Sequence, residues 1–185
     1  GNSTAGSAGG GMYCTSNADL INVTVSGNEA NGASSGLYFT VSFVTLQNCI
    51  VWGNTPNSPD QIHAALSANM FIYYSDIEYG WLGEGANNIN SDPLFTNPAV
   101  MDYSLQQDSP CVDSGNPDPE YNDPDGTHND MGAFYFHQEP GCIDESACNY
   151  NPGATMDDGS CLYFDCTDEC GGSAFIDDCG GCSEG

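Results

Sequence analysis

The sequence predicts an all-β protein, a parallel β-solenoid followed by a small, disulfide-rich and mostly irregular C-terminal module. Three observations lead to this prediction. The first half of the chain repeats itself every 26 residues, the repeated text is rich in Val, Thr, Ile and aromatic residues, and seven of the ten cysteines lie between Cys142 and Cys182. We expect coils over residues 1–89, a closing segment over 90–139 and the Cys-rich module over 140–185.

The repeat is clearest where DLINVTVSGN (residues 19–28) is echoed by TLQNCIVWGN (residues 45–54). A second stretch, GGMY at 10–13, matches GLYF at 36–39, and a degraded third copy follows. Two rows of equivalent apolar residues result: Leu20, Leu46 and Ile72, and Val25, Val51 and Ile77. Each residue of a solenoid lies over its equivalent one repeat away, so we expect each row to form one interior stack.

The two rows are five positions apart within each repeat, which breaks the strict alternation of a single strand. A bend between two strands explains this spacing and places Asn22 and Asn48 at the bend. We expect each of these side-chain amides to hydrogen-bond to the next coil in a structural role.

Four segments between residues 9 and 95 resemble a known kind of repeat: GGGMYC, VTVSGNEA, LQNCIVWGN and YSDIEYGWLGEGANNINSDPLF. They are similar to the right-handed parallel β-helix repeats of secreted and surface proteins of marine and environmental bacteria, with chlamydial polymorphic outer-membrane repeats as more distant relatives. The resemblance implies a right-handed parallel β-helix. It implies little about activity, because this fold carries many functions.

The closing segment begins near Asn90, where the period is lost and the text becomes acidic. It resembles the segment that terminates such bacterial β-helices. A solenoid needs a cap over its last coil. We expect the cap to be made by the segment's apolar residues, which are Leu94, Phe95, Tyr103, Leu105, Val112 and residues 134–136.

The charge of the chain points to a bound cation. There are 26 acidic residues and no Lys or Arg, so self-repulsion opposes compaction, and Ca²⁺ prefers carboxylate and carbonyl oxygens. We therefore expect Ca²⁺ as a cofactor. Residues 123–130 alternate oxygen-bearing side chains around a glycine, and an Asx-rich turn without metal is the alternative. The candidate ligands in this segment are Asp113, Asn116, Asp118, Asp123, Asp125, Thr127 and Asp130.

The tail reads GCIDESACNYNPGATMDDGSC over residues 141–161 and continues with DCTDECGG and DDCGGC. It resembles short Cys-containing repeats near the C-termini of secreted Bacteroidota-type proteins, and the Asp/Cys/Gly repeats of calcium-binding stalks such as the thrombospondin type 3 kind. So small a segment buries little apolar area, so disulfides and cations must hold it.

Further candidate calcium ligands are Asp157, Asp158, Asp165, Asp168, Asp177 and Asp178. The candidate disulfide cysteines are Cys142, Cys148, Cys161, Cys166, Cys170, Cys179 and Cys182, with Cys111 as a possible partner because seven is an odd number. Their connectivity is open. Zinc at the two closely spaced cysteine pairs is the rival interpretation.

The missing basic residues exclude several functions. Nucleic acids and anionic membranes both require Lys or Arg. We expect no enzymatic activity, because β-helix lyases typically use a basic residue as the proton acceptor. The acids of the third coil (Asp60, Asp76, Glu78 and Glu84) do not form the carboxylate pair of a glycosidase, and His63, His128 and His137 are scattered.

We therefore expect an extracellular or cell-surface structural protein. The function we favour is that of a building block of a surface filament or appendage, which assembles with neighbouring subunits through the open β-helix end. The alternatives are an adhesin stalk that presents loops such as residues 54–61 to glycans or cell surfaces, and a remnant of a polysaccharide-degrading β-helix enzyme. Possible glycosylation sequons occur at Asn2 and Asn22, and we favour Asn2.

Overall fold

The computed structural model describes residues 2–4, 10–31, 34–40, 43–55, 61–64, 69–178 and 180–183. The described residues are all-β, and their only helical segments are two 3-10 turns, Pro98–Val100 and Pro119–Tyr121. None of them forms a helix long and apolar enough to cross a membrane. The chain divides into two compact units, residues 1–136 and 137–185.

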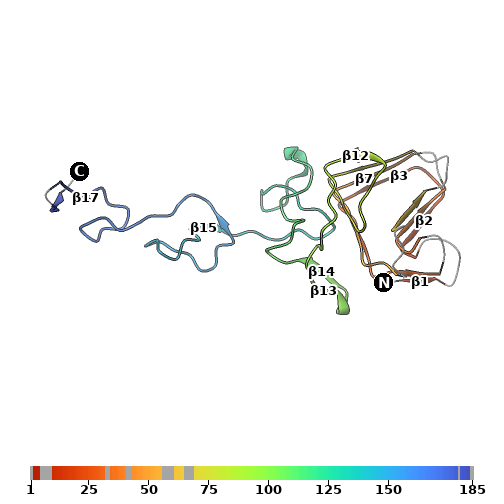
Figure 1. The fold of residues 1–185 in the computed structure, drawn as a ribbon, viewed down its shortest axis with the longest axis horizontal. Helices are drawn as coiled ribbons and strands as arrows, with labels where there is room; N and C mark the ends of the chain where they lie inside the picture. The colour runs from red at the N-terminus through yellow and green to blue at the C-terminus, as the bar shows by residue number, and fades with distance from the viewer. Residues whose placement is uncertain are drawn as a thin grey trace. The chain divides into compact units, whose positions relative to one another are not determined.

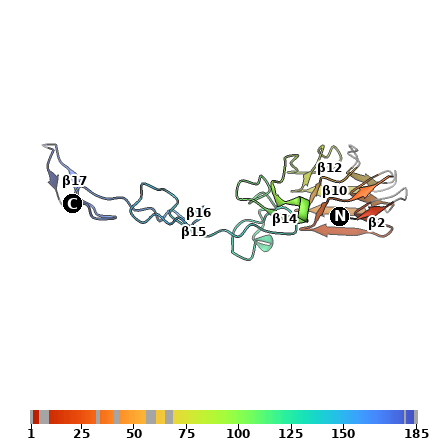
Figure 2. The same ribbon diagram turned by 90° about the horizontal axis from the view of Figure 1, so that it is seen from below.

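The first unit contains several small parallel sheets (Figures 1 and 2). One sheet holds β3 (Ala18–Ile21), β7 (Phe43–Gln47), β10 (Asn69–Tyr73) and β12 (Glu84–Ala86). A second holds β4 (Thr24–Ser26), β8 (Ile50–Trp52) and β11 (Asp76–Ile77), and a third holds β2 (Met12–Cys14), β6 (Leu37–Phe39) and β9 (Ile62–Ala64). A short pair holds β1 (Ser3–Thr4) and β5 (Glu29–Ala30).

Strand pairing follows the 26-residue period of the sequence. Leu20 lies opposite Leu46, which lies opposite Ile72 in the next strand. The second row pairs in the same way, with Val51 between Val25 and Ile77. Both expected stacks are confirmed.

The register of the third sheet differs from the prediction by one residue. Met12 pairs with Leu37, an offset of 25, whereas the sequence match placed it on residue 38. The neighbouring sheet returns to an offset of 26, with Ala18 opposite Val44. The chain therefore has one more residue between Phe39 and Val44 than between the paired Cys14 and Ala18.

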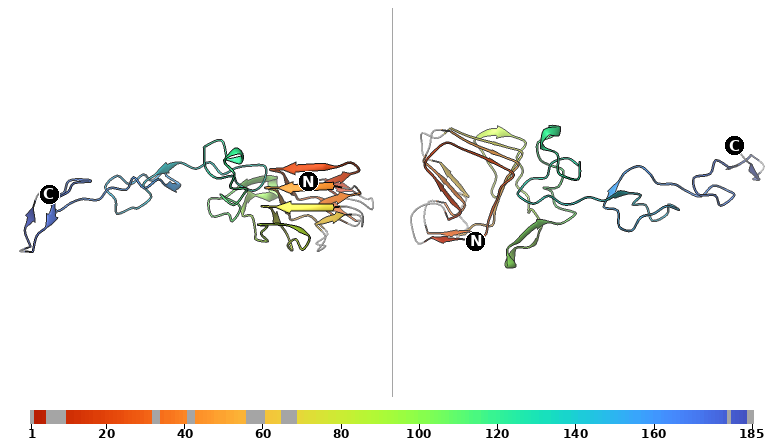
Figure 3. Two further views of the ribbon diagram at one scale, coloured as in Figure 1. Left: turned by 90° about the horizontal axis from the view of Figure 1, so that it is seen from above. Right: turned by 180° about the vertical axis from the view of Figure 1, so that it is seen from behind.

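Figures 1 and 3 show the sheets arranged around a common interior, which is filled by apolar side chains. Its buried side chains come from all three of the larger sheets and contact one another: Leu20, Val25, Leu37, Phe39, Val44, Leu46, Cys49, Val51, Met70, Ile72 and Ile77. Full burial of one such aliphatic side chain contributes roughly 1.5–3 kcal/mol. This interior is the main source of stability of the stack.

The predicted bend is present at Asn22 and Asn48, which share the same left-handed φ of 52°. Asn tolerates this conformation better than most residues. The backbone N–H groups of these residues bond to the next coil, but the Asn48 side chain does not. Its Oδ1 atom accepts a hydrogen bond of 2.8 Å from the backbone N–H of Asn116. The expected coil-to-coil amide bond is therefore wrong at Asn48.

An amide ladder between coils lies instead at the corner that follows each bend. The backbone N–H and the Nδ2 atom of Asn28 both donate to Asn54 Oδ1, at 3.1 and 2.9 Å. The backbone N–H of Asn2 donates to Asn28 Oδ1 in the same way, at 2.9 Å. Asn28 and Asn54 are buried, so this ladder satisfies polar groups that would otherwise destabilise the stack.

The closing segment packs along the side of the stack and not over its last coil. Val51 points inward, so strand alternation places Ile50 and Trp52 on the outer face of β8. Ile50 is buried there with Phe95, Leu105, Cys111 and Met131. Backbone N–H groups of the segment also bond to the stack, from Gly132 to Asn48 O at 2.7 Å and from Ala133 to Thr24 Oγ1 at 2.9 Å.

The predicted cap is thus corrected. Of its expected residues, Phe134 and Tyr135 are 52% and 41% exposed, and Leu105 belongs to the lateral cluster. Trp81, from the turn after the third coil, packs against the interior instead. The antiparallel hairpin of β13 (Phe95–Asn97) and β14 (Asp102–Leu105) forms part of the lateral segment.

The second unit contains two short strand pairs. β15 (Pro140–Gly141) pairs with β16 (Met156–Asp157), and β17 (Phe175–Ile176) pairs with β18 (Cys182–Ser183). Three disulfides link its residues: Cys142–Cys161, Cys148–Cys170 and Cys166–Cys182. The expected disulfide role of these six cysteines is confirmed and indicates an oxidising environment. Cys179 lies outside the described residues.

Candidate functional site

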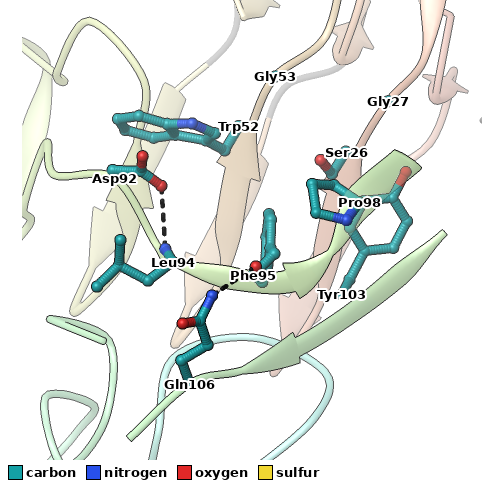
Figure 4. A pocket seen from close by; sticks show the side chains of 10 residues that line it. All are labelled: Ser26, Gly27, Trp52, Gly53, Asp92, Leu94, Phe95, Pro98, Tyr103 and Gln106. Carbon is teal, nitrogen blue, oxygen red and sulfur yellow. Dashed lines mark hydrogen bonds between the residues drawn. The ribbon is translucent and has the colours of Figure 1, made fainter. Parts of the chain in front are cut away.

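A pocket of about 540 Å³ lies where one corner of the stack meets the β13–β14 hairpin (Figure 4). We call it the Trp52–Tyr103 pocket. The stack contributes Ser26, Gly27, Trp52 and Gly53. The lateral segment contributes Asp92, Leu94, Phe95, Pro98, Tyr103 and Gln106. Its volume is in the range of small-molecule sites.

The repeat explains the positions of the residues that the stack contributes to the pocket. Trp52 is the last residue of β8 and points outward, and Gly53 turns the chain with a φ of 67°. Gly27 is the equivalent turn one coil earlier, with a φ of 66°. A side chain at Gly27 would collide with the hydroxyl of Tyr103, so glycine is needed there both for its backbone conformation and for the fit of Tyr103.

The opposite side is held in place by its own contacts. Leu94 donates its backbone N–H to Asp92 Oδ1 at 3.0 Å, which fixes a tight turn. The Nε2 atom of Gln106 donates to the carbonyl of Phe95 at 3.0 Å. The rings of Phe95 and Tyr103 pack edge to face with centroids 5.2 Å apart. The wall of the pocket is therefore largely preformed.

The pocket combines aromatic rings with one carboxylate. Asp92 is exposed, Trp52 and Tyr103 are half-buried, and the chain has no Lys or Arg to neutralise the carboxylate. Figure 4 shows Asp92 beside the indole of Trp52, with Pro98 and Tyr103 across the pocket. Such a site disfavours anions.

A second polar feature of the first unit is a buried pair formed by Asp76 and Cys111. The Cys111 thiol donates to Asp76 Oδ2 at 3.3 Å, and the backbone N–H of Ser91 donates to Asp76 Oδ1 at 3.2 Å. Burial raises the pKa of Asp76 to about 6, and burial together with the nearby Asp76 raises the pKa of Cys111 far above its usual range. Cys111 is a free thiol, so its predicted disulfide is wrong.

The predicted calcium ligands of the acidic segment mostly accept hydrogen bonds from the chain. Asp130 accepts backbone N–H groups from Asp113 and Phe136, at 2.7 and 2.6 Å. Asp123 accepts from the backbone N–H of Asp130 at 2.8 Å and from Asn129 Nδ2 at 3.2 Å. Burial raises the pKa of Asp130 to about 6 and also raises the pKa of Asp123.

The remaining candidates of this segment form local turns. Asp125 Oδ1 accepts from the backbone and hydroxyl of Thr127, at 3.1 and 2.7 Å. Asn116 Oδ1 accepts from the backbone of Asp118 at 3.0 Å. Among the described residues, no three His, Cys, Asp or Glu side chains are grouped to hold a metal ion. The geometry is that of Asx turns, and calcium here stays a prediction.

The predicted ligands of the tail behave similarly. Asp165 Oδ1 accepts from the hydroxyl and backbone of Thr167, at 2.7 and 2.8 Å, and these bonds, with those from other backbone groups, lower its pKa to about 2. In three other candidate ligands, a carboxylate oxygen accepts a backbone N–H from a residue two or four positions later in the chain. These are Asp157, Asp158 and Asp177. Asp168 and Asp178 are exposed.

The other candidate residues are not brought together. His63 stacks on Tyr38 with ring centroids 4.8 Å apart, His128 contacts the carbonyl of Asp113, and His137 pairs with Glu139 at 2.8 Å. Asn2 is exposed and Asn22 is half-buried. Asp60 and most of the loop proposed for display, residues 56–60, lie outside the described residues.

Sequence reasoning missed both the Trp52–Tyr103 pocket and the Asp76–Cys111 pair. The outward position of Trp52 could have been read from its place next to the inward Val51. Its partners come from the segment without a period, so no spacing indicates them. Comparison of the chain with protein families, with curated proteins and with solved structures finds no match.

Proposed function

We propose that the chain is a non-enzymatic structural protein of the cell exterior, built as a right-handed parallel β-helix that associates through one open end. The observation that supports this is the outer edge of β2, β3 and β4. Each of these strands pairs with the next coil on one side, and no other described strand pairs with its other side.

An open edge of this kind offers unpaired backbone groups to another strand. The Asn22 N–H points to the next coil, toward Gln47 O at 3.0 Å. Because N–H directions alternate along a strand, the N–H groups of Asp19 and Ile21 point to the open edge. The proposed occupant is the strand edge of a second copy of the chain, which would extend the parallel ladder.

The charge of the chain sets the conditions for association. Two copies with a net charge of -26 each repel one another, and no basic residue offsets this. Screening at physiological ionic strength acts over about 8 Å, so copies in contact still repel. We therefore include calcium in the proposal: divalent cations promote association by binding between carboxylates.

The test compares Ile21→Pro with Ile21→Val. Ile21 is 50% exposed, so neither change opens a core cavity, but proline removes the N–H at the open edge. We expect wild type and Ile21→Val to form oligomers or fibres with calcium chloride and to dissociate with EDTA, and Ile21→Pro to stay monomeric. Sedimentation velocity and negative-stain microscopy give the readout. A wild-type protein that is monomeric in both conditions would refute the proposal.

The second candidate function is an adhesin, and the Trp52–Tyr103 pocket is the observation that favours it. A preformed aromatic pocket on the side of a stiff stack is suited to ligand binding. Ser26, the last residue of the edge strand β4, lines this pocket, so the pocket borders the open edge.

A further inference from the structure

We propose that the Trp52–Tyr103 pocket binds the ammonium group of an organic cation. The inference goes beyond the proposed function and does not rest on it, because the pocket lies on the side of the stack and is complete in a single chain.

The first support is the aromatic lining. An ammonium group is attracted to the face of Trp, Tyr or Phe within about 6 Å of the ring centre, and Trp is the most favourable. The pocket presents all three types, with Trp52 on one side and Phe95 and Tyr103 from the hairpin. The contacts within the hairpin and the glycine turn at Gly27 hold Phe95 and Tyr103 in place before any ligand arrives.

The second support is the carboxylate. The Leu94 N–H bonds to Asp92 Oδ1 and fixes the orientation of this side chain beside the indole. In an ordinary protein an exposed carboxylate is often paired with a lysine or arginine of the same chain. This chain has neither, and no histidine lines the pocket, so a cation that pairs with Asp92 there comes from outside.

The third support is the field of the whole chain. A net charge of -26 raises the local concentration of cations and lowers that of anions. A neutral sugar would gain from the rings, from Gln106 and from hydrogen bonds of its hydroxyls to Asp92, but not from attraction between opposite charges. The observations therefore favour a cation over a neutral polyol and disfavour an anion.

The ammonium group has two possible sources, a free quaternary amine or a lysine side chain of another protein. Choline chloride and Nα-acetyl-lysine amide are the probes for the two. Each is titrated into the full chain in EDTA, which keeps divalent cations from competing. The readout is the indole N–H resonance of Trp52 in NMR spectra, assigned with Trp52→Phe.

The decisive variant is Asp92→Asn. Asparagine keeps the side-chain oxygen that accepts the Leu94 N–H, so the turn is retained while the charge is lost. The matched control is Asp102→Asn, which removes one charge from the same hairpin outside the pocket. We expect binding of the favoured probe to weaken roughly tenfold or more in Asp92→Asn and to stay unchanged in Asp102→Asn. Added salt should weaken binding to wild type.

Binding of choline alone identifies a small quaternary amine, and binding of the lysine derivative alone identifies a protein side chain. Both results support the proposal. Three results overturn it: no shift of the Trp52 resonance with either probe, equal binding of glucose, or equal binding by the Asp92→Asn and Asp102→Asn variants.

Discussion

At the scale of single residues, Asp76 is unusual because it is a buried carboxyl group in a chain without Lys or Arg. It is fully buried, its partners are a thiol and one backbone N–H, and no cation of the chain is available to it. Burial without a compensating charge raises its pKa to about 6 from 3.8. The folded state therefore holds a proton on Asp76 more tightly than the unfolded state does.

This makes a prediction about pH. Stability from a raised carboxyl pKa is present at low pH and is lost as the pH rises from about 4 through about 6, by roughly 3 kcal/mol for Asp76. Asp76→Asn removes this contribution, so we expect a higher free energy of unfolding than wild type at pH 7.5 and a flatter dependence below it. Urea denaturation at several pH values measures both.

Asp102→Asn is the control for Asp76→Asn, because hydrogen bonds from Ser104 lower the pKa of Asp102. Its contribution has the opposite sign and is lost as the pH falls. Identical pH profiles for wild type and Asp76→Asn would contradict the account of Asp76.

The pair with Cys111 could not be predicted from the sequence. The two residues are 35 positions apart and belong to segments that share no period. The stacks around Leu46 were predictable, because a repeat fixes which residues lie over one another. The partner of the Asn48 side chain was predicted wrongly for a related reason, because Asn116 also lies outside the repeat.

At the scale of elements, the repeat predicted the strands of the coils well, and the 25-residue offset of the third sheet is the main departure. The lateral position of the closing segment was not predicted. The prediction assumed that the closing segment covers the last coil of the stack. The outward side chains of Ile50 and Trp52 instead form an apolar strip on the side of the stack. Burial of that strip decides where the segment lies.

The second unit depends on its disulfides because its strands are too short to be stable alone. β15 and β16 have two residues each, and Cys142 and Ala147 are its buried apolar residues among those described. The Cys142–Cys161 bond closes a separation of 19 residues, which corresponds to about 3 kcal/mol in the chain-entropy description.

We expect the double variant Cys142→Ser/Cys161→Ser to lose amide protection at β15 and β16 and in the turns between them. Hydrogen exchange read by mass spectrometry measures this. Cys14→Ser, which removes a free thiol of the stack, should leave the second unit unchanged. Retained protection in the double variant would show that other contacts hold this unit together.

At the scale of the whole molecule, one physical fact connects the proposals: the chain has 26 acidic residues and no Lys or Arg. The buried side chains of Asp130 and Asn54 are satisfied by backbone N–H groups and amides. Unless a histidine is protonated, the cation that pairs with an Asp or Glu side chain has to come from outside the chain. Association with calcium and ammonium binding at Asp92 are two consequences of the same composition.

The account as a whole depends on the stacking of equivalent residues in successive coils. The most direct measurement is the set of methyl–methyl nuclear Overhauser contacts of Leu46 and Val51 in the isotope-labelled chain. We predict contacts from Leu46 to both Leu20 and Ile72, and from Val51 to both Val25 and Ile77, since neighbouring strands lie about 4.8 Å apart. Contacts of Leu46 with neither Leu20 nor Ile72 would contradict the stack and every proposal built on it.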